Sequence, residues 1–136
     1  MSNAQNLAYA VVQVAHNFGA VAAVGGSLAA IRLRNPATRI KLARLALGGW
    51  ITQGVSGAAF GATSYYFYQR LPDIAGIAVA ALLVKIACVV VAATLLAAYL
   101  WRGGNWSEAA SQNTWRGSSA LAFTALTAAA FLRWFS

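Results

Sequence analysis

The chain has 136 residues, of which 60% are hydrophobic and 9% are charged. A soluble domain carries roughly 25% charged residues, so the composition excludes an ordinary water-soluble domain and favours an integral membrane protein. A net charge of +8 would indicate nucleic-acid binding in a soluble protein. In a membrane protein it reflects the Lys and Arg of cytoplasmic loops, and we expect no nucleic-acid partner.

Four apolar segments, each close to the roughly 20 residues that a bilayer requires, make residues 1–136 a single transmembrane domain. They cover residues 7–31, 43–68, 74–101 and 114–135. The six residues before the first segment contain no Lys or Arg, whereas a signal peptide begins with positive charge. We therefore expect a retained first span, and an all-α, antiparallel, up-down four-helix bundle that crosses the inner (cytoplasmic) membrane several times.

The first segment carries the only histidine of the chain, His16. At 100° per residue, it shares a helical face with mostly small residues: Tyr9, Val12, Gly19, Ala23, Gly26 and Ala30. A polar group in hydrocarbon must find a partner, so His16 either hydrogen-bonds to Gln53 or a threonine, or is an axial ligand of a haem iron. In the second case Gly19 leaves room for the porphyrin, and Gln13 and Gln53 supply further polar groups.

The connections contain residues that end and begin helices. Asn35-Pro36 breaks the helix after the first segment, and Thr38 is placed to cap the next one. In the turn Leu71-Pro72-Asp73, Asp73 is placed to cap the third helix. Residues 107–113 are expected to form a short interfacial turn before the fourth span.

The basic residues predict an orientation. Most of them flank the first and third connections: Arg32, Arg34, Arg39, Lys41, Arg44, Arg102 and Arg116. The opposite side has Arg70 and Arg133. Because cytoplasmic loops are enriched in Lys and Arg, we expect the first and third connections in the cytoplasm and both termini on the outer, periplasmic side.

The second segment is rich in glycine. Gly57-Ala-Ala-Phe-Gly61 is a GxxxG motif, and Gly54 lies on nearly the same face. Such motifs let helix backbones approach closely in membranes. Three interpretations are open: helix packing inside the bundle through Gly54, Gly57 and Gly61, a seam between two copies of the chain, or a face that admits a flat cofactor ring.

The third segment contains a lysine, Lys85, on a face of small residues: Ala78, Ala81, Cys88 and Ala92. A lysine near the bilayer centre costs about 2.5–3.5 kcal/mol on insertion scales. At 1.5 Å per residue it lies roughly 16 Å from the outer end of its span, close to the depth of His16. Lys85 either fixes the bundle, or is a ligand, a counter-charge to an anion or a proton carrier.

Several of these features occur together in two membrane families. They are His16, the pair Gly25-Gly26, the basic first loop, the sequence SGAAFG and the sequence ALLVKIACVVV. Over roughly residues 7–100 the chain resembles the CopD-like copper-resistance membrane domains and the HemJ-type protoporphyrinogen oxidases, four-helix proteins of about this size. The HemJ-type resemblance implies that His16 and Lys85 are the functional positions and that haem b is the cofactor.

The chain also departs from those families. The HemJ-type motif that contains tryptophan and ends in Leu-Pro-Arg is missing after His16, and there is no second histidine. Whether the chain is an enzyme is therefore left open. CopD-like copper transport is an alternative, although Cu(I) prefers Met, Cys and His ligands and only His16 and Cys88 lie within the predicted spans.

Two functions follow from these patterns. The leading prediction is a membrane-embedded redox or electron-transfer protein that binds haem b, with His16 as metal ligand and Lys85 as second ligand or electrostatic partner. The alternative is a non-catalytic structural or accessory subunit that packs against the helices or pigment of a larger membrane complex. Bilayer lipid and other subunits or further copies of the chain are the expected partners.

Overall fold

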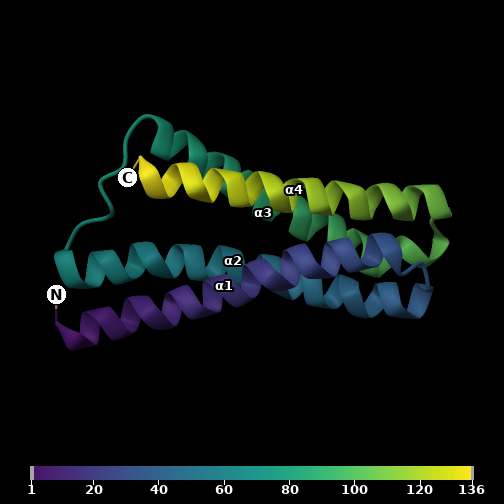
Figure 1. Cartoon of the computed structure of the whole chain (residues 1–136), viewed down its shortest axis with the longest axis horizontal. Helices are drawn as coiled ribbons and strands as arrows, with labels where there is room; N and C mark the ends of the chain where they lie inside the picture. Colours follow the sequence, from purple (N-terminus) through teal and green to yellow (C-terminus); the bar gives the residue numbers. More distant parts are fainter. Residues whose placement is uncertain (1, 136) are drawn as a thin grey trace.

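The structure, a computed structural model, describes residues 2–135 as four long helices with short connections (Figure 1). Helix α1 spans Asn3–Arg32, α2 spans Pro36–Tyr68, α3 spans Ile77–Arg102 and α4 spans Glu108–Trp134, with a 3₁₀ turn, η1, at Gly103–Asn105. Residues 2–135 contain no strand. The predicted all-α class is confirmed.

The helices run alternately in opposite directions, with both chain ends and the α2–α3 connection at one end of the bundle (Figure 1). Helix α1 packs most extensively on α2, and α3 on α4; smaller contacts join α2 to α3 and α1 to α4. Helices α1 and α3 are therefore diagonal neighbours, and side chains that join them must cross the centre of the bundle.

Small side chains fill most of that centre. Only three large apolar side chains are almost completely buried, Trp50, Leu96 and Trp115. The remaining core is mainly alanine: Ala23, Ala30, Ala43, Ala46, Ala78, Ala81, Ala92, Ala122, Ala125 and Ala128. The predicted inward faces of the first and third segments are confirmed, because their small residues are buried as expected.

Glycines bring α1 and α2 into close contact, but not those of the GxxxG motif. A Cβ on Gly49 would lie 2.6 Å from the Ala23 nitrogen and 2.7 Å from the Gly19 oxygen. A Cβ on Gly57 or Gly61 would meet nothing within 4 Å. Packing inside the bundle is therefore the wrong interpretation for Gly57 and Gly61. The inward face of α2 carries Gly49 instead. Of the three predicted packing glycines, Gly54 alone faces another helix, because a Cβ there would lie 3.3 Å from the Val89 side chain.

Two predicted caps are wrong. Helix α2 is capped by Asn35, whose side-chain oxygen accepts from the Thr38 nitrogen at 3.1 Å, so Thr38 is the capped residue. Helix α3 begins after Gly76, which has no side-chain cap and a φ of +52° that favours glycine. Asp73 lies in the connection before it.

The fourth helix starts earlier than expected. Ser107 accepts from the Ala110 nitrogen at 3.2 Å, and Glu108 occupies the first turn, where a negative charge complements the helix dipole. Residues 108–113 are therefore helical and do not form an interfacial turn. The extra turns carry the polar residues that bind α2, described below.

Two helices are long and apolar enough to cross a membrane, α1 and the stretch Ile77–Asn105. Only 11% and 22% of their most apolar windows are buried, which differs from the core helices of a soluble protein. The described parts of α2 and α4 do not pass the same test. The structure therefore supports two candidate spans where the sequence predicted four.

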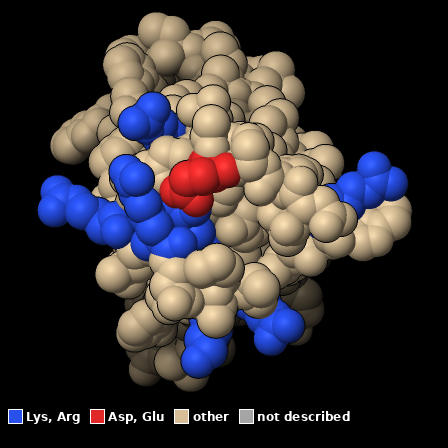
Figure 2. Space-filling model, turned by 90° about the vertical axis from the view of Figure 1, so that its right-hand side faces the viewer, with Lys and Arg blue, Asp and Glu red and all other residues tan. Residues whose placement is uncertain are grey.

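The basic end of the bundle is opposite the chain termini. Figure 2 views the end that holds the α1–α2 and α3–α4 connections, where Lys and Arg surround an acidic patch. The two groups of basic residues used to predict orientation thus lie at opposite ends of one bundle, as a membrane topology requires.

Candidate functional site

The two polar groups predicted to lie at the same depth are in direct contact. The Lys85 amine of α3 lies 2.9 Å from Nε2 of His16 on α1, across the diagonal of the bundle. The other ring nitrogen of His16, Nδ1, lies 2.7 Å from the Ser56 hydroxyl of α2. One imidazole therefore links three helices.

The hydrogen bonds assign the protons of the site. The Ser56 hydroxyl donates its single proton to the Thr52 carbonyl oxygen one turn earlier in α2. It therefore accepts from His16, whose Nδ1 carries the proton. Nε2 is then an acceptor, and Lys85 donates to it. Both ring nitrogens are thus engaged inside the protein.

The remaining predicted residues have different roles. The Gln53 amide donates to the backbone carbonyl oxygen of His16, so it orients the helix and not the ring. Gln13 donates to Asn17 on its own helix at 2.7 Å. Gly19 is buried against α2, where its missing side chain makes room for Thr52 and Gly49.

Sequence reasoning missed two residues of the site, Ser56 and Phe60. The Phe60 ring packs edge-on to the imidazole, with ring centroids 5.7 Å apart. Ser56 follows Gln53 by three residues, so both fall on one helical face. Because Gln53 was a predicted partner of His16, this spacing could have identified Ser56 as a second one.

A cavity of about 190 Å³ adjoins the pair and is bordered by all four helices. Its lining residues are Gln13, His16, Asn17, Ala20, Ala23, Val24, Trp50, Gln53, Lys85, Ala122, Ala125, Leu126 and Ala129. Gln13, Asn17 and Leu126 are exposed, which puts the mouth between α1 and α4 on the side of the bundle. The polar groups come from α1, α2 and α3, and the α4 lining is apolar.

These dimensions do not fit a haem. Ligand pockets usually measure roughly 300–1,000 Å³, more than the cavity beside His16. A metal between two nitrogen ligands needs them about 4 Å apart, twice a metal–nitrogen bond of about 2 Å, whereas Nε2 and the Lys85 amine are 2.9 Å apart. The larger hollow, about 460 Å³ between α3 and α4, is lined by apolar residues and two threonines.

Those two threonines, Thr124 and Thr127, are candidates for the threonine partner that the sequence predicted for His16. Both donate to carbonyl oxygens of their own helix, at 2.9 Å each, and both side chains are exposed. They do not join the His16–Lys85 pair. Cys88 is buried on the Lys85 face of α3, and residues 2–135 contain no group of three or more His, Cys, Asp or Glu that could hold a metal ion.

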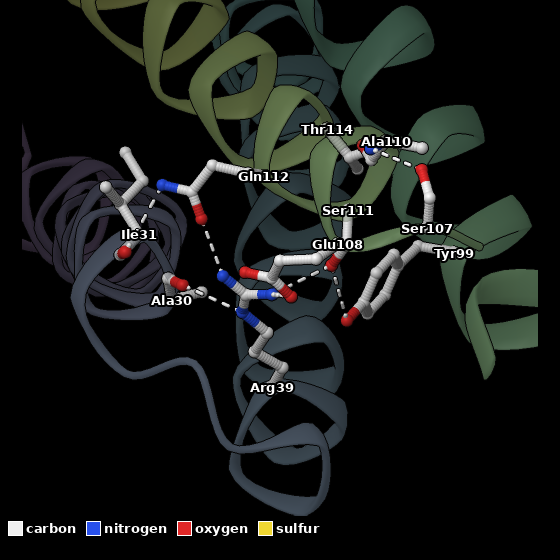
Figure 3. A network of polar contacts seen from close by, with 10 residues as sticks. All are labelled: Ala30, Ile31, Arg39, Tyr99, Ser107, Glu108, Ala110, Ser111, Gln112 and Thr114. Atoms are coloured by element: carbon white, nitrogen blue, oxygen red, sulfur yellow. Dashed lines mark hydrogen bonds and ion pairs between the residues drawn. The ribbon is translucent and has the colours of Figure 1, made fainter.

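A second polar network, at the basic end, surrounds Arg39 (Figure 3). Its guanidinium donates to the Ala30 carbonyl oxygen at 3.0 Å, to Ser111 at 3.0 Å and to Gln112 at 2.6 Å. It also forms an ion pair with Glu108 at 3.0 Å. The Arg39 side chain is 2% exposed and thus fastens α1, α2 and α4 together.

The sequence predicted Arg39 among the basic residues that flank the first connection and indicated no buried partners for it. Arg39 lies in the first turns of α2, and four polar partners offset its burial. Gln112 extends the network by donating to the Ile31 carbonyl oxygen at 3.3 Å. Glu108, one of only two acidic residues in the sequence, was the available signal for a partner.

Comparisons of the chain with protein-family models, with curated proteins and with solved structures found no match. The resemblance to CopD-like and HemJ-type proteins therefore stays a prediction. The conclusions below rest on the residues and contacts of this chain.

Proposed function

We propose that this chain is a multi-pass inner-membrane protein that acts as a non-catalytic subunit, binding a helix of a membrane partner at the open stretch of α2 around Gly57 and Gly61. Gly57 and Gly61 carry the proposal, because their GxxxG motif has open space where a Cβ would lie. Lipid tails do not drive helices together, so close backbone contact at small residues is a main source of association in membranes.

The packing of the helices supports four spans. At 1.5 Å per residue, α1 and α2 are roughly 45 and 50 Å long, enough to cross a hydrocarbon core of about 30 Å. Helix α2 packs extensively on α1, and α4 on α3. If α1 and α3 cross the bilayer, their partners α2 and α4 occupy the same layer.

Cysteine labelling tests the topology. In a Cys88→Ser background, single cysteines replace Ser2 at the terminal end and Gly104 at the basic end. We expect an impermeant maleimide to label the Ser2→Cys variant in whole spheroplasts and the Gly104→Cys variant only after lysis. Equal labelling of both variants in intact spheroplasts contradicts the proposed orientation, and recovery of the chain in the soluble fraction contradicts membrane insertion.

Leucine substitutions test the subunit role. A leucine at Gly57 or Gly61 blocks close approach, so we expect it to abolish co-migration with the partner on native gels in mild detergent. Gly48→Leu is the matched control, because Gly48 is exposed, has open space at its Cβ and lies on the opposite side of α2 from Gly57. The mass of the wild-type complex tells a second copy from a different subunit. Unchanged migration of all three variants refutes the proposal.

Haem b binding is the second candidate, and one observation favours it. The Ser56 hydroxyl accepts from Nδ1 of His16, and ligating histidines commonly use their other nitrogen in this way. Binding requires Lys85 to leave Nε2 and the cavity to enlarge. The absorption spectrum of the chain purified with haem supplied decides this: a Soret band lost in His16→Ala supports haem, and no band in the wild type ends the hypothesis.

A further inference from the structure

Two residues that line the cavity, Lys85 and Trp50, carry N–H groups without a hydrogen-bond partner within residues 2–135. Trp50 is 1% exposed and lines the cavity, and its indole Nε1 has no hydrogen-bond partner within residues 2–135. A buried tryptophan N–H usually has one. The Lys85 amine makes one hydrogen bond in the same part of the chain, to His16, which leaves further N–H donors on the same nitrogen.

The cavity has no complementary acid among the described residues. Its polar lining consists of amides, an imidazole, an indole and an amine, and the sequence holds only two acidic residues. One of these, Glu108, pairs with Arg39, and the other, Asp73, lies in the connection before α3. The described residues therefore offer these N–H donors no carboxylate, and an oxygen acceptor from outside the chain is the group that complements them.

The volume and the apolar wall of the cavity limit the size and the polarity of the part of the ligand that does not bear the oxygen acceptor. A volume of about 190 Å³ equals roughly six waters at about 30 Å³ each, enough for one small ring or a short chain end. The α4 lining, Ala122, Ala125, Leu126 and Ala129, presents only apolar groups. The mouth, beside exposed Gln13, Asn17 and Leu126, opens on the side of the bundle, which the proposed topology turns toward lipid.

We propose that this cavity binds the oxygen-bearing head group of a membrane-soluble molecule, with Lys85 and Trp50 as donors and α4 as the apolar wall. The carboxylate of a fatty acid and the carbonyl of a quinone share the chemistry that these donors recognise. The site rests on the proposed membrane insertion, but it is independent of the proposed partner contact on α2, because Gly57 and Gly61 do not line the cavity.

Titration calorimetry on the detergent-purified chain tests the proposal with two probes, a medium-chain fatty acid and a ubiquinone analogue with a short alkyl tail. We expect at least one probe to bind saturably with one site per chain. Binding of the acid alone identifies a carboxylate ligand, and binding of the quinone alone identifies a carbonyl ligand. If neither probe saturates, the proposal is overturned.

Variants then locate the bound probe. Lys85→Met removes the charged donor and is expected to weaken binding about tenfold or more, and Trp50→Phe, which removes one neutral donor, about threefold to tenfold. Lys41→Met and Trp101→Phe are matched controls, since both residues are exposed and neither lines the cavity. Wild-type affinity in both Lys85→Met and Trp50→Phe overturns the assignment.

A third variant tests whether binding is lost because the cavity is filled or because the protein no longer folds. Ala125→Leu adds bulk to the α4 wall without removing a donor and is expected to abolish binding. Far-UV circular dichroism and gel filtration report whether each variant keeps the wild-type fold. Wild-type affinity in a folded Ala125→Leu protein also overturns the proposal.

Discussion

The Lys85 amine and the His16 imidazole meet at 2.9 Å across the diagonal of the bundle and join two helices that make few other contacts. Within residues 2–135 the Lys85 amine has no hydrogen-bond partner except Nε2 of His16, and Nε2 has none except Lys85, although Nδ1 also bonds to Ser56. The pair therefore behaves as one unit in the energetics of the fold.

Removing one member of this pair is expected to lower the free energy of unfolding by more than the hydrogen bond itself contributes. Lys85→Met leaves Nε2 of His16 without a partner, and His16→Ala leaves the Lys85 amine without one; an unsatisfied group of this kind costs about 1–3 kcal/mol. The double variant is expected to lose less than the sum of the single losses, by up to about 1.7 kcal/mol. Unfolding by sodium dodecyl sulfate in mixed micelles measures these values. Strict additivity shows that the two groups do not interact.

Arg39 is expected to be the most sensitive basic residue of the chain. Arg39→Met leaves the polar groups of Ser111 and Gln112 buried without this partner and should cost about 1–3 kcal/mol of unfolding free energy for each group left unsatisfied. Glu108→Gln removes one charge-assisted hydrogen bond of the buried Arg39 and should cost about 1.5–3 kcal/mol. Arg34→Met, an exposed control in the adjoining connection, should be neutral. Equal losses for Arg39 and Arg34 contradict a structural role for Arg39.

Helical periodicity predicted the inward faces of α1 and α3, because a 3.6-residue repeat fixes which side chains share a face. Depth along the helix likewise placed His16 and Lys85 in one layer. Sequence could not show that their nitrogens touch, because that depends on α1 and α3 being diagonal neighbours. Sequence also could not show that Gly57 and Gly61 lack a close neighbour, because that depends on how closely the other helices approach this part of α2.

Arg39 illustrates a different limit. A basic residue just after Asn35-Pro36 fits a cytoplasmic loop equally well, and only the early start of α4 brings Glu108, Ser111 and Gln112 within reach. The predicted interfacial turn placed Glu108, Ser111 and Gln112 outside the fourth helix, so helical spacing gave no reason to pair them with Arg39. An error in one helix boundary thus concealed a buried network.

Ser27 and Ser118 form a smaller link of the same kind. Their hydroxyl oxygens lie 2.7 Å apart between α1 and α4, and both side chains are fully buried. Ser118→Ala should cost about 0.5–1.5 kcal/mol, and Ser27→Ala in the same background should add little, because its partner is already gone. Thr124→Ala is the control, since its hydroxyl bonds only within α4. Independent losses for the two serines contradict the bond.

The last prediction compares two glycines of α2. Gly49→Ala places a methyl group 2.6 Å from the Ala23 nitrogen, so α1 and α2 must separate, and overpacking of this kind costs about 1–3 kcal/mol. Gly57→Ala meets open space and should be neutral or stabilising by up to about 1 kcal/mol, because alanine favours helix. The same micellar unfolding measures both. If Gly57→Ala destabilises the isolated chain as much as Gly49→Ala does, the open space at Gly57 is wrong, and the proposed partner contact with it.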